Sequence, residues 1–156
     1  MPRDSRLSRM LHVLIHMDRH LKRATSAAIS KMLGTNPVVV RRMMAGLRDR
    51  GYVLSEKGHG GGWELTCDLS SITLLDVYEA VGAPPLFSIG PSTEHPECLV
   101  EQAVDARMHE TLQAAETLLR ERLGAITVAE LAQDFDRRSA ERPGHEHSDE
   151  GCRTPA

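Results

Sequence analysis

Two adjacent arginines, Arg41 and Arg42, stand near the start of a segment that can form a helix. Asn36 is a suitable N-cap for that helix, and Pro37 suits its first position. Val38 shares the arginines' face of the helix. In a DNA major groove, arginine can bind guanine or phosphate, and valine can contact a thymine methyl group. The pattern favours a helix that reads DNA, and the alternative is a basic, solvated face of an ordinary helical bundle.

The opposite face of the same helix is apolar. Val40, Met44 and Leu47 are spaced to pack against preceding helices, and Ala45 lies on the side of Val38. The free backbone N–H groups at the start of the helix can also bind a phosphate. We expect this helix to end near Arg50, before Gly51.

A glycine-rich hairpin follows the helix. Extended runs at 52–56 and 63–66 flank the sequence Lys57-Gly58-His59-Gly60-Gly61-Gly62. The glycines allow the backbone to approach a sugar-phosphate chain, while Lys57 and His59 supply positive or switchable charge. Trp63 is interpreted as a core anchor beneath the hairpin, because an isolated tryptophan more often packs than reads bases.

Three cysteines, Cys67, Cys98 and Cys152, are too few and too sparse for a disulfide scaffold. Cys98 is expected near the start of a long helix, where the helix dipole favours thiolate and hence redox sensing. The acidic residues around it, at positions 94, 97 and 101, disfavour thiolate. Cys98 is therefore either a redox or electrophile sensor or an inert, part-buried cysteine, and Cys67 is expected to be structural.

Several histidines suggest a possible metal site. His145 and His147 with Cys152, or His95 with Cys98, could chelate zinc, but their spacings are not those of a closed structural site. A further pair, His12 and His16, stands one helical turn apart among apolar residues that favour packing. We expect no metal site.

The elements that must position these residues can be placed along the chain. We expect two helices within residues 5–33, the second capped at 25–26 and ended by Gly34, then the helix and hairpin above. A helix is expected at 72–81 with Ser71 as a cap, a proline-rich connector at 83–96, and helices at 97–123 and 127–135. The fold class is therefore mostly α with a small β-wing: a winged helix-turn-helix domain plus a long dimerisation helix. The expected units are a DNA-binding domain at 1–82, the connector at 83–96, the dimerisation helix and short closing helix at 97–135, and a disordered tail at 136–156.

The long helix carries one narrow apolar stripe. Its residues are spaced four, four, three, four and four apart, close to the pattern of a two-helix seam: Val104, Met108, Leu112, Ala115, Leu119 and Leu123. The stripe could pack on its own domain, but a small domain can hardly cover so long a helix. We expect a homodimer interface.

Composition narrows the class of protein. The 156 residues fit one domain with a short appendage, and 40% apolar content suffices for a core. No apolar run approaches a membrane span, and the first residues lack a signal-peptide profile, so we expect a cytoplasmic protein with no membrane partner. Aromatic residues, at 3%, are too few to stack single-stranded nucleic acid. Residues 1–66 hold 12 Lys/Arg against 5 Asp/Glu, a net charge of +7, whereas residues 67–156 hold 7 against 17, a net charge of −10. Residues 1–66 are therefore expected to bind an anionic partner.

The sequence resembles the Rrf-two family of bacterial winged-helix transcription regulators over about residues 5–135. The resemblance is carried by the recognition-helix entry at 35–43, by the glycine-rich wing through Trp63-Glu64-Leu65, and by the segments 72–81 and 125–131. It implies a homodimer that binds a partly palindromic operator in double-stranded DNA and usually represses. The residues expected to contact DNA are Thr35, Asn36, Pro37, Val38, Arg41, Arg42, Lys57, His59, Gly60 and Gly61.

The family includes iron–sulfur cluster regulators, nitric-oxide-sensing repressors and cysteine-metabolism repressors. Cluster-bearing members place three cysteines in and just after the connector, whereas this chain has only Cys98 there, and Glu101 where some members have histidine. One thiolate cannot hold a cluster that needs four ligands. The sequence is closer to the cluster-free branch, which keeps a segment like His95-Pro96-Glu97-Cys98, so we expect no cofactor.

Enzymatic motifs are missing from the sequence. It has no phosphate-binding glycine motif, no nucleophile elbow and no metalloprotease helix. The rival hypotheses are a thiol oxidoreductase built on Cys98, which has no resolving Cys-x-x-Cys partner, and a protein-only interaction module. We expect a non-enzymatic repressor, with Cys98 as its candidate sensor of redox or electrophile stress.

Overall fold

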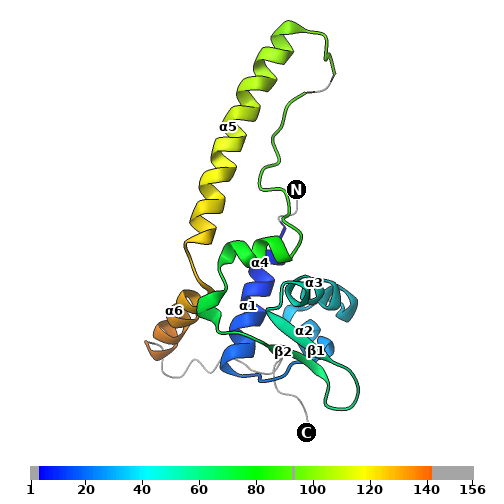
Figure 1. The fold of residues 1–156 in the computed structure, drawn as a ribbon, viewed down its shortest axis with the longest axis vertical. Helices are drawn as coiled ribbons and strands as arrows, with labels where there is room; N and C mark the ends of the chain where they lie inside the picture. Colours follow the sequence, from blue (N-terminus) through cyan, green and yellow to red (C-terminus); the bar gives the residue numbers. More distant parts are fainter. Residues whose placement is uncertain (1–3, 93, 142–156) are drawn as a thin grey trace.

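A computed structural model describes residues 4–92 and 94–141 (Figure 1). The described part of the chain is mostly helical and contains one two-stranded antiparallel sheet, as the sequence predicted. In chain order its elements are α1 (Arg6–Arg19), α2 (Ser26–Leu33), α3 (Pro37–Asp49), β1 (Val53–Glu56), β2 (Gly62–Leu65), a 3-10 turn η1 (Leu69–Ser71), α4 (Leu74–Ala80), α5 (Leu99–Gly124) and α6 (Val128–Ala140).

The limits of α2 and α3 follow from local capping. The Thr25 side chain accepts a hydrogen bond from the Ala28 N–H, and Gly34 ends α2 in the left-handed conformation, with φ of 59°. Asn36 caps α3 by accepting from the Val38 N–H at 2.8 Å, and Pro37 occupies the first turn. These predictions from the sequence are confirmed.

The start of α4 differs from the prediction. Thr73, rather than Ser71, is its N-cap, and Asp76 completes a reciprocal capping box. Ser71 belongs to the preceding 3-10 turn, where its hydroxyl donates to the Asp68 carbonyl at 2.6 Å. In this capping box the Thr73 hydroxyl accepts from the Asp76 N–H, and the Asp76 carboxylate accepts from the Thr73 N–H. The helix α4 therefore begins at Leu74 and not at position 72.

The core lies where α1 meets the faces of α3 and α4. Its fully buried side chains include Met10 and Leu14 of α1 and Val40, Met44 and Leu47 of α3. Burial of these side chains is the dominant force that holds the three helices together.

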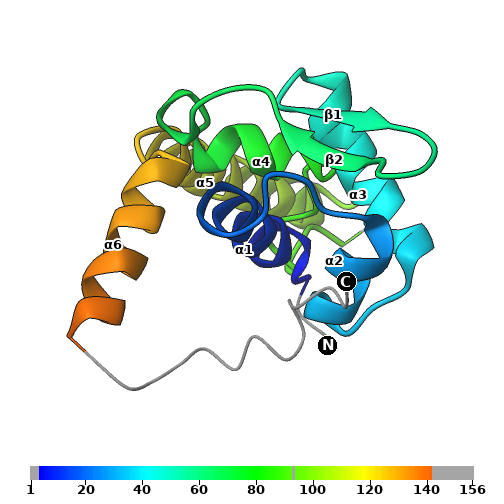
Figure 2. The same ribbon diagram turned by 90° about the horizontal axis from the view of Figure 1, so that it is seen from below.

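The hairpin is anchored to this core by Trp63, which is only 6% exposed. Its indole N–H donates to the Ser26 hydroxyl at 2.9 Å, and its backbone pairs with Ala24. The interpretation of Trp63 as a core anchor is confirmed. The register of the sheet pairs Val53 with Leu65 and Glu56 with Gly62, so the glycine-rich loop extends beyond the body (Figure 2).

The long helix α5 projects away from the body, and the connector runs back beside it (Figure 1). Its 26 residues make a rod about 39 Å long, and none of them is buried. The helix contacts the body at its C-terminal end, where Leu75 of α4 packs beside Gly124.

The closing helix α6 is longer than predicted. It begins with a capping box between Thr127 and Glu130, as its sequence allows, but continues beyond Phe135 to Ala140. The first residues of the expected tail are therefore helical, because Arg137 and Arg138 pair with Asp134 across one turn. The rest of that tail, including His145, His147 and Cys152, lies outside the described residues.

Both views place α6 on one side of α1 and α2 and α3 on the other (Figures 1 and 2). None of the helices in residues 4–92 and 94–141 has the length and apolar character needed to cross a membrane.

Candidate nucleic-acid interface

The first half of α3 presents an exposed surface of two valines and two arginines. Val38 is 54% exposed and Val39 is 43% exposed, and Arg41 and Arg42 are exposed beside them. Neither arginine makes an ion pair or a side-chain hydrogen bond with the described part of the chain. Both guanidinium groups are therefore available to an external anion or base edge.

The second half of α3 differs in its electrostatics. Arg48 pairs with Asp49 at 3.0 Å, and Arg50 pairs with Glu79 of α4 at 3.2 Å. Unpaired positive charge is thus concentrated near the N-terminus of α3, where the helix dipole is also positive. In helix-turn-helix proteins this end of the recognition helix contacts bases.

The residues that precede α3 shape its entry. The side-chain oxygen of Asn36 is occupied by the cap, which leaves its amide N–H₂ group as a donor on an exposed side chain. Thr35 and Pro37 are half-buried. Asn36 thus presents a donor group at the exposed start of α3, whereas Thr35 and Pro37 are less accessible.

The orientation of α3 depends on two residues that the sequence analysis did not single out. Gly46 lies so close to α4 that a Cβ atom there would be 1.8 Å from the Ala80 carbonyl oxygen. Glu79, the residue before Ala80 in α4, accepts a hydrogen bond from Arg120 of α5 at 2.5 Å and also pairs with Arg50. One carboxylate therefore joins the end of α3 to the base of α5.

The wing places Lys57, His59 and Gly60 on the surface, and Gly61 half-buried behind them. Gly60 has φ of 73°, and a Cβ atom at Gly61 would be 2.3 Å from the Glu56 carbonyl oxygen. These two glycines are therefore needed by the turn itself, in addition to any contact that the backbone makes outside the chain.

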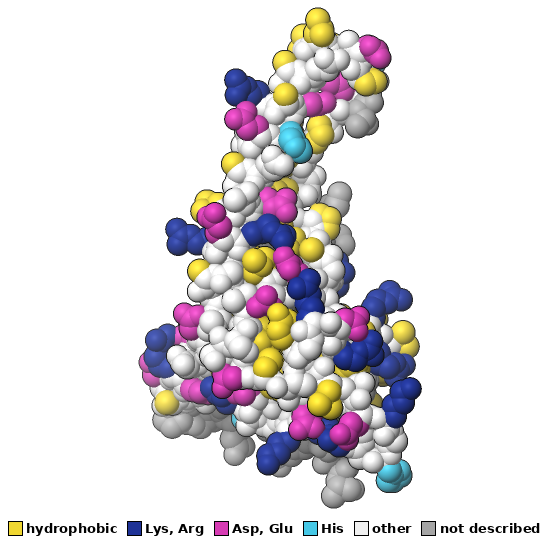
Figure 3. Space-filling view, viewed as in Figure 1, with side chains coloured by type: hydrophobic (Ala, Val, Ile, Leu, Met, Phe, Trp, Pro, Cys, Tyr) yellow, Lys and Arg dark blue, Asp and Glu magenta, His cyan; other side chains and the backbone are white. Residues whose placement is uncertain are grey.

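Arg23, in the loop before α2, holds the base of the wing. Its guanidinium pairs with Glu56 at 2.7 Å and Glu64 at 2.8 Å, and it donates to the Gly60 carbonyl at 3.0 Å. The hydrogen bond to Glu64 raises the pKa of Arg23 above its ordinary value. Arg23 neutralises two carboxylates beside the loop, and its distance in sequence from both explains why sequence analysis missed it. Lys and Arg side chains gather on the side of the body that carries α3 and the wing (Figure 3).

Cys98 is the N-cap of α5 and is exposed. The alternative of a part-buried cysteine is therefore wrong for the single chain, because the end of α5 projects away from the body. Cys67, after β2, is half-buried and packs against the core.

Known proteins match this chain over most of its length. The model of a family described as "Rrf2: Iron-dependent Transcriptional regulator" matches residues 3–134. The chain is 29% identical over 130 residues to YwnA of Bacillus subtilis (strain 168), named as an HTH-type transcriptional regulator, covering 82% of this chain and 95% of YwnA.

Solved structures share the fold. A transcriptional regulator from Lactobacillus plantarum superimposes with a TM-score of 0.73 at 22% identity, covering 88% of this chain and 93% of that one. The oxidised form of Staphylococcus aureus CymR gives a TM-score of 0.55 at 18% identity, covering 85% and 96%. At these identities the likeness establishes the fold alone.

The iron dependence in the family's description can be tested against the residues present. Residues 4–92 and 94–141 contain no group of three or more His, Cys, Asp or Glu side chains that could hold a metal ion. Cys98 stands at the far end of α5, whereas Cys67 lies in the body beside the core. The described residues of one chain do not fit an iron–sulfur cluster, which needs several converging ligands.

The helical order α1–α2–α3, the two-stranded wing and the family match over residues 3–134 agree with one another. The chain belongs to the Rrf2 (Rrf-two) family of winged-helix, DNA-binding transcription regulators.

Proposed function

We propose that the protein is a homodimeric repressor that reads a partly palindromic operator with one α3 in the major groove of each half-site. The observation that carries this proposal is the pair of exposed, unpaired arginines on the N-terminal half of α3, beside exposed valines. The wing would lie on the flanking backbone or minor groove. The contacting residues would be Thr35, Asn36, Pro37, Val38, Arg41, Arg42, Lys57, His59, Gly60 and Gly61.

Each arginine has a distinct expected effect. If Arg41 binds a guanine edge in a bidentate manner, its loss costs about 1–3 kcal/mol and relaxes specificity at one base pair. If Arg42 binds phosphate, its loss weakens binding to all sequences and lowers the salt dependence by about one released ion. In a dimer the two half-sites would be centred about 10 bp apart, or a multiple of that.

The test is fluorescence anisotropy of the protein with duplexes from the promoter region of its own gene. Arg41→Ala and Arg42→Ala should each weaken binding, while Arg48→Ala is the matched control, because Arg48 lies on the same helix but pairs with Asp49. Affinity that is unchanged in the Arg41→Ala, Arg42→Ala double variant and unaffected by salt would contradict the proposal.

Dimerisation is supported by the exposed state of α5. None of its side chains is buried, and Leu99, Val100, Val104 and Leu118 are all more than half exposed. Leu99, Val100, Val104 and Met108 also line a shallow apolar hollow. Exposed apolar patches of this kind mark interaction surfaces, and a second copy of the same helix would cover this one.

Cys98 is the proposed redox sensor. Its thiolate sulfur would attack a peroxide, forming a sulfenic acid and releasing water, and Cys98 of a second copy would then displace a second water to form a disulfide. The two sulfurs together lose two electrons, and the peroxide gains them. Support comes from the exposed position of Cys98 at the end of α5.

Treatment with hydrogen peroxide should release the wild-type protein and the Cys67→Ser variant from DNA, but not Cys98→Ser. Basal binding should be the same in all three. Peroxide release that persists in Cys98→Ser would exclude Cys98 as the sensor.

A further inference from the structure

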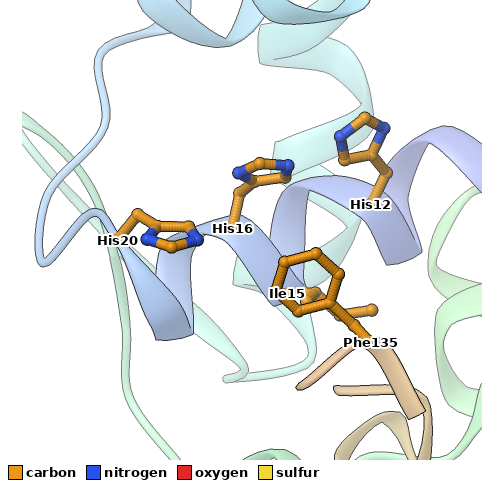
Figure 4. Close-up of a pocket in the computed structure, with 5 residues that line it drawn as sticks. All are labelled: His12, Ile15, His16, His20 and Phe135. Atoms are coloured by element: carbon orange, nitrogen blue, oxygen red, sulfur yellow. The ribbon is translucent and has the colours of Figure 1, made fainter. Parts of the chain in front are cut away.

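A cavity of about 300 Å³ lies between α1 and α6. It is lined by His12, Ile15, His16, His20 and Phe135 (Figure 4). Its volume is at the lower end of the range for pockets that bind small molecules. None of its lining residues has a role in the proposed contact with DNA.

The three histidines form one wall of this cavity. They are spaced four residues apart on α1, which places their side chains on one face of the helix. The ring centres of His12 and His16 are 4.6 Å apart, and those of His16 and His20 are 5.6 Å apart. His16, in the middle, is only 7% exposed. Three imidazoles in a row at a cavity are a concentrated set of hydrogen-bonding groups.

The rest of the cavity is apolar. Phe135 of α6 meets the ring of His20 edge-on, at 6.4 Å between ring centres and an angle of 89°. Ile15, half-buried, lies beside it (Figure 4). Arg19 and Asp136 pair at 2.8 Å immediately next to these residues and hold α6 against α1. The pocket thus has a histidine wall and an apolar, aromatic wall.

A metal ion is a poor match for these walls. Two histidines one turn apart can chelate a transition metal, but a stable site needs further ligands. Among the described residues, no three His, Cys, Asp or Glu side chains are placed so that they could hold a metal ion together. The cavity is also larger than one ion requires, and its aromatic wall would contribute nothing to coordination.

We propose that the pocket binds a small aromatic carboxylate, with its ring against Phe135 and Ile15 and its carboxylate hydrogen-bonded to the imidazoles. Offset or edge-on packing suits an aromatic ring beside Phe135. A carboxylate accepts hydrogen bonds from N–H groups, and a protonated imidazole carries two of them, so it can donate to the ligand while it keeps an interaction within the protein. The proposal concerns binding alone and does not depend on the function proposed for α3.

Benzoate is the probe, and the readout is the NMR spectrum of the histidine Cε1–H groups of the full-length protein. Titration should shift the signals of His12, His16 and His20 in a saturable way, with a dissociation constant in the millimolar range that is usual for so small a ligand. His59 of the wing and His109 of α5 are internal controls and should not move. Benzamide, a neutral analogue of the same shape, should bind about tenfold more weakly, because it lacks the charge that strengthens the hydrogen bonds.

Two variants locate the site. Phe135→Leu keeps an apolar side chain but removes the aromatic wall, and His20→Gln removes one exposed imidazole, so each should weaken benzoate binding about fivefold or more. His59→Gln is the matched control and should bind as the wild type does. A far-UV circular dichroism spectrum that matches the wild type would establish that both variants remain folded.

The outcomes decide between ligands. An absence of saturable shifts, equal binding of benzamide and benzoate, or unchanged binding in both Phe135→Leu and His20→Gln would each overturn the proposal. A parallel titration with Zn²⁺ tests the metal: one equivalent bound tightly, without any response to benzoate, would also overturn it and identify a metal site instead.

Discussion

Gly46 is a residue at which helix propensity and packing oppose each other. Alanine is favoured over glycine inside a helix by about 1 kcal/mol. Here, however, the added Cβ atom would be 1.8 Å from the Ala80 carbonyl oxygen, which belongs to the backbone of α4 and cannot rotate away. Packing should therefore decide the sign of the effect.

We expect Gly46→Ala to lower the free energy of unfolding by about 1–3 kcal/mol, measured by urea denaturation. Gly90→Ala is the control, because a Cβ atom at Gly90 would meet nothing within 4 Å. A Gly46→Ala variant as stable as the wild type would mean that α3 and α4 do not approach so closely.

Arg23 gives a second prediction at this scale. Arg23→Gln should leave Glu56 and Glu64 without their cation, and two uncompensated carboxylates would then face the DNA backbone beside the wing. Operator affinity should fall about tenfold at low salt, and less at high salt, because screening weakens the repulsion. Stability should change little, since solvent-exposed ion pairs contribute little to it.

The added substitution Glu64→Gln should restore part of the affinity lost in Arg23→Gln. Anisotropy titrations at two salt concentrations measure both effects. A loss that ignores salt and is not rescued would point to a misfolded wing.

At the scale of elements, α4 connects α3 to the long helix α5. Glu79 pairs with Arg50 after α3 and with Arg120 of α5, and the Arg120 guanidinium also lies over the Tyr78 ring, 5.7 Å from its centre. Glu79→Gln should increase hydrogen exchange in residues 44–50 and weaken operator binding while leaving the oligomeric state unchanged. Glu116→Gln is the matched control, because Glu116 approaches Arg120 only at 3.8 Å. Equal exchange in the two variants would contradict a link through Glu79.

The start of α6 should respond to acid. The Glu130 carboxylate accepts the Thr127 backbone N–H, and this bond, followed by that from the Thr127 hydroxyl, lowers the pKa of Glu130 below its ordinary 4.5. A lowered pKa in the folded state means that the cap stabilises α6 above pH 4.5 and is lost as the pH falls through the folded value. Ellipticity at 222 nm should therefore fall on acidification more in the wild type than in Glu130→Gln, which lacks this titration. Identical acid profiles would show that the cap contributes nothing.

Elements held by local chemistry were predictable from the sequence. Thr25 and Gly34 cap the two ends of α2. Asn36 caps the start of α3, and Pro37 occupies its first turn. Features that depend on distant residues were not, including the pairing of Arg23 with the wing and the contact of Gly46 with Ala80. The α4 cap was misplaced because Ser71 and Thr73 both suit that role, and only Thr73 has an acidic residue three positions later. The exposed arginines of α3 were predictable from helical period, but which of them contacts DNA stays a prediction.

For the whole molecule, the proposed homodimer depends on α5. Leu112→Glu with Leu119→Glu places two charges on its apolar stripe, and burying them at a helix–helix seam is unfavourable. We expect this double variant to sediment as a monomer at micromolar concentration and to lose operator binding. Gln113→Glu, off the stripe, is the control and should remain a dimer. A wild-type monomer with full operator affinity would contradict the proposed assembly.

Trp63 makes the molecule its own optical reporter. It is the chain's single tryptophan, and it lies almost fully buried at the junction of the wing with α2, with its indole N–H bonded to Ser26. Indole emission depends on the polarity around the ring, so the tryptophan fluorescence of the protein monitors the place where the wing joins the body. Any event that lifts the wing from the body would shift that emission to longer wavelength, and the motion could be followed in real time without attaching a dye.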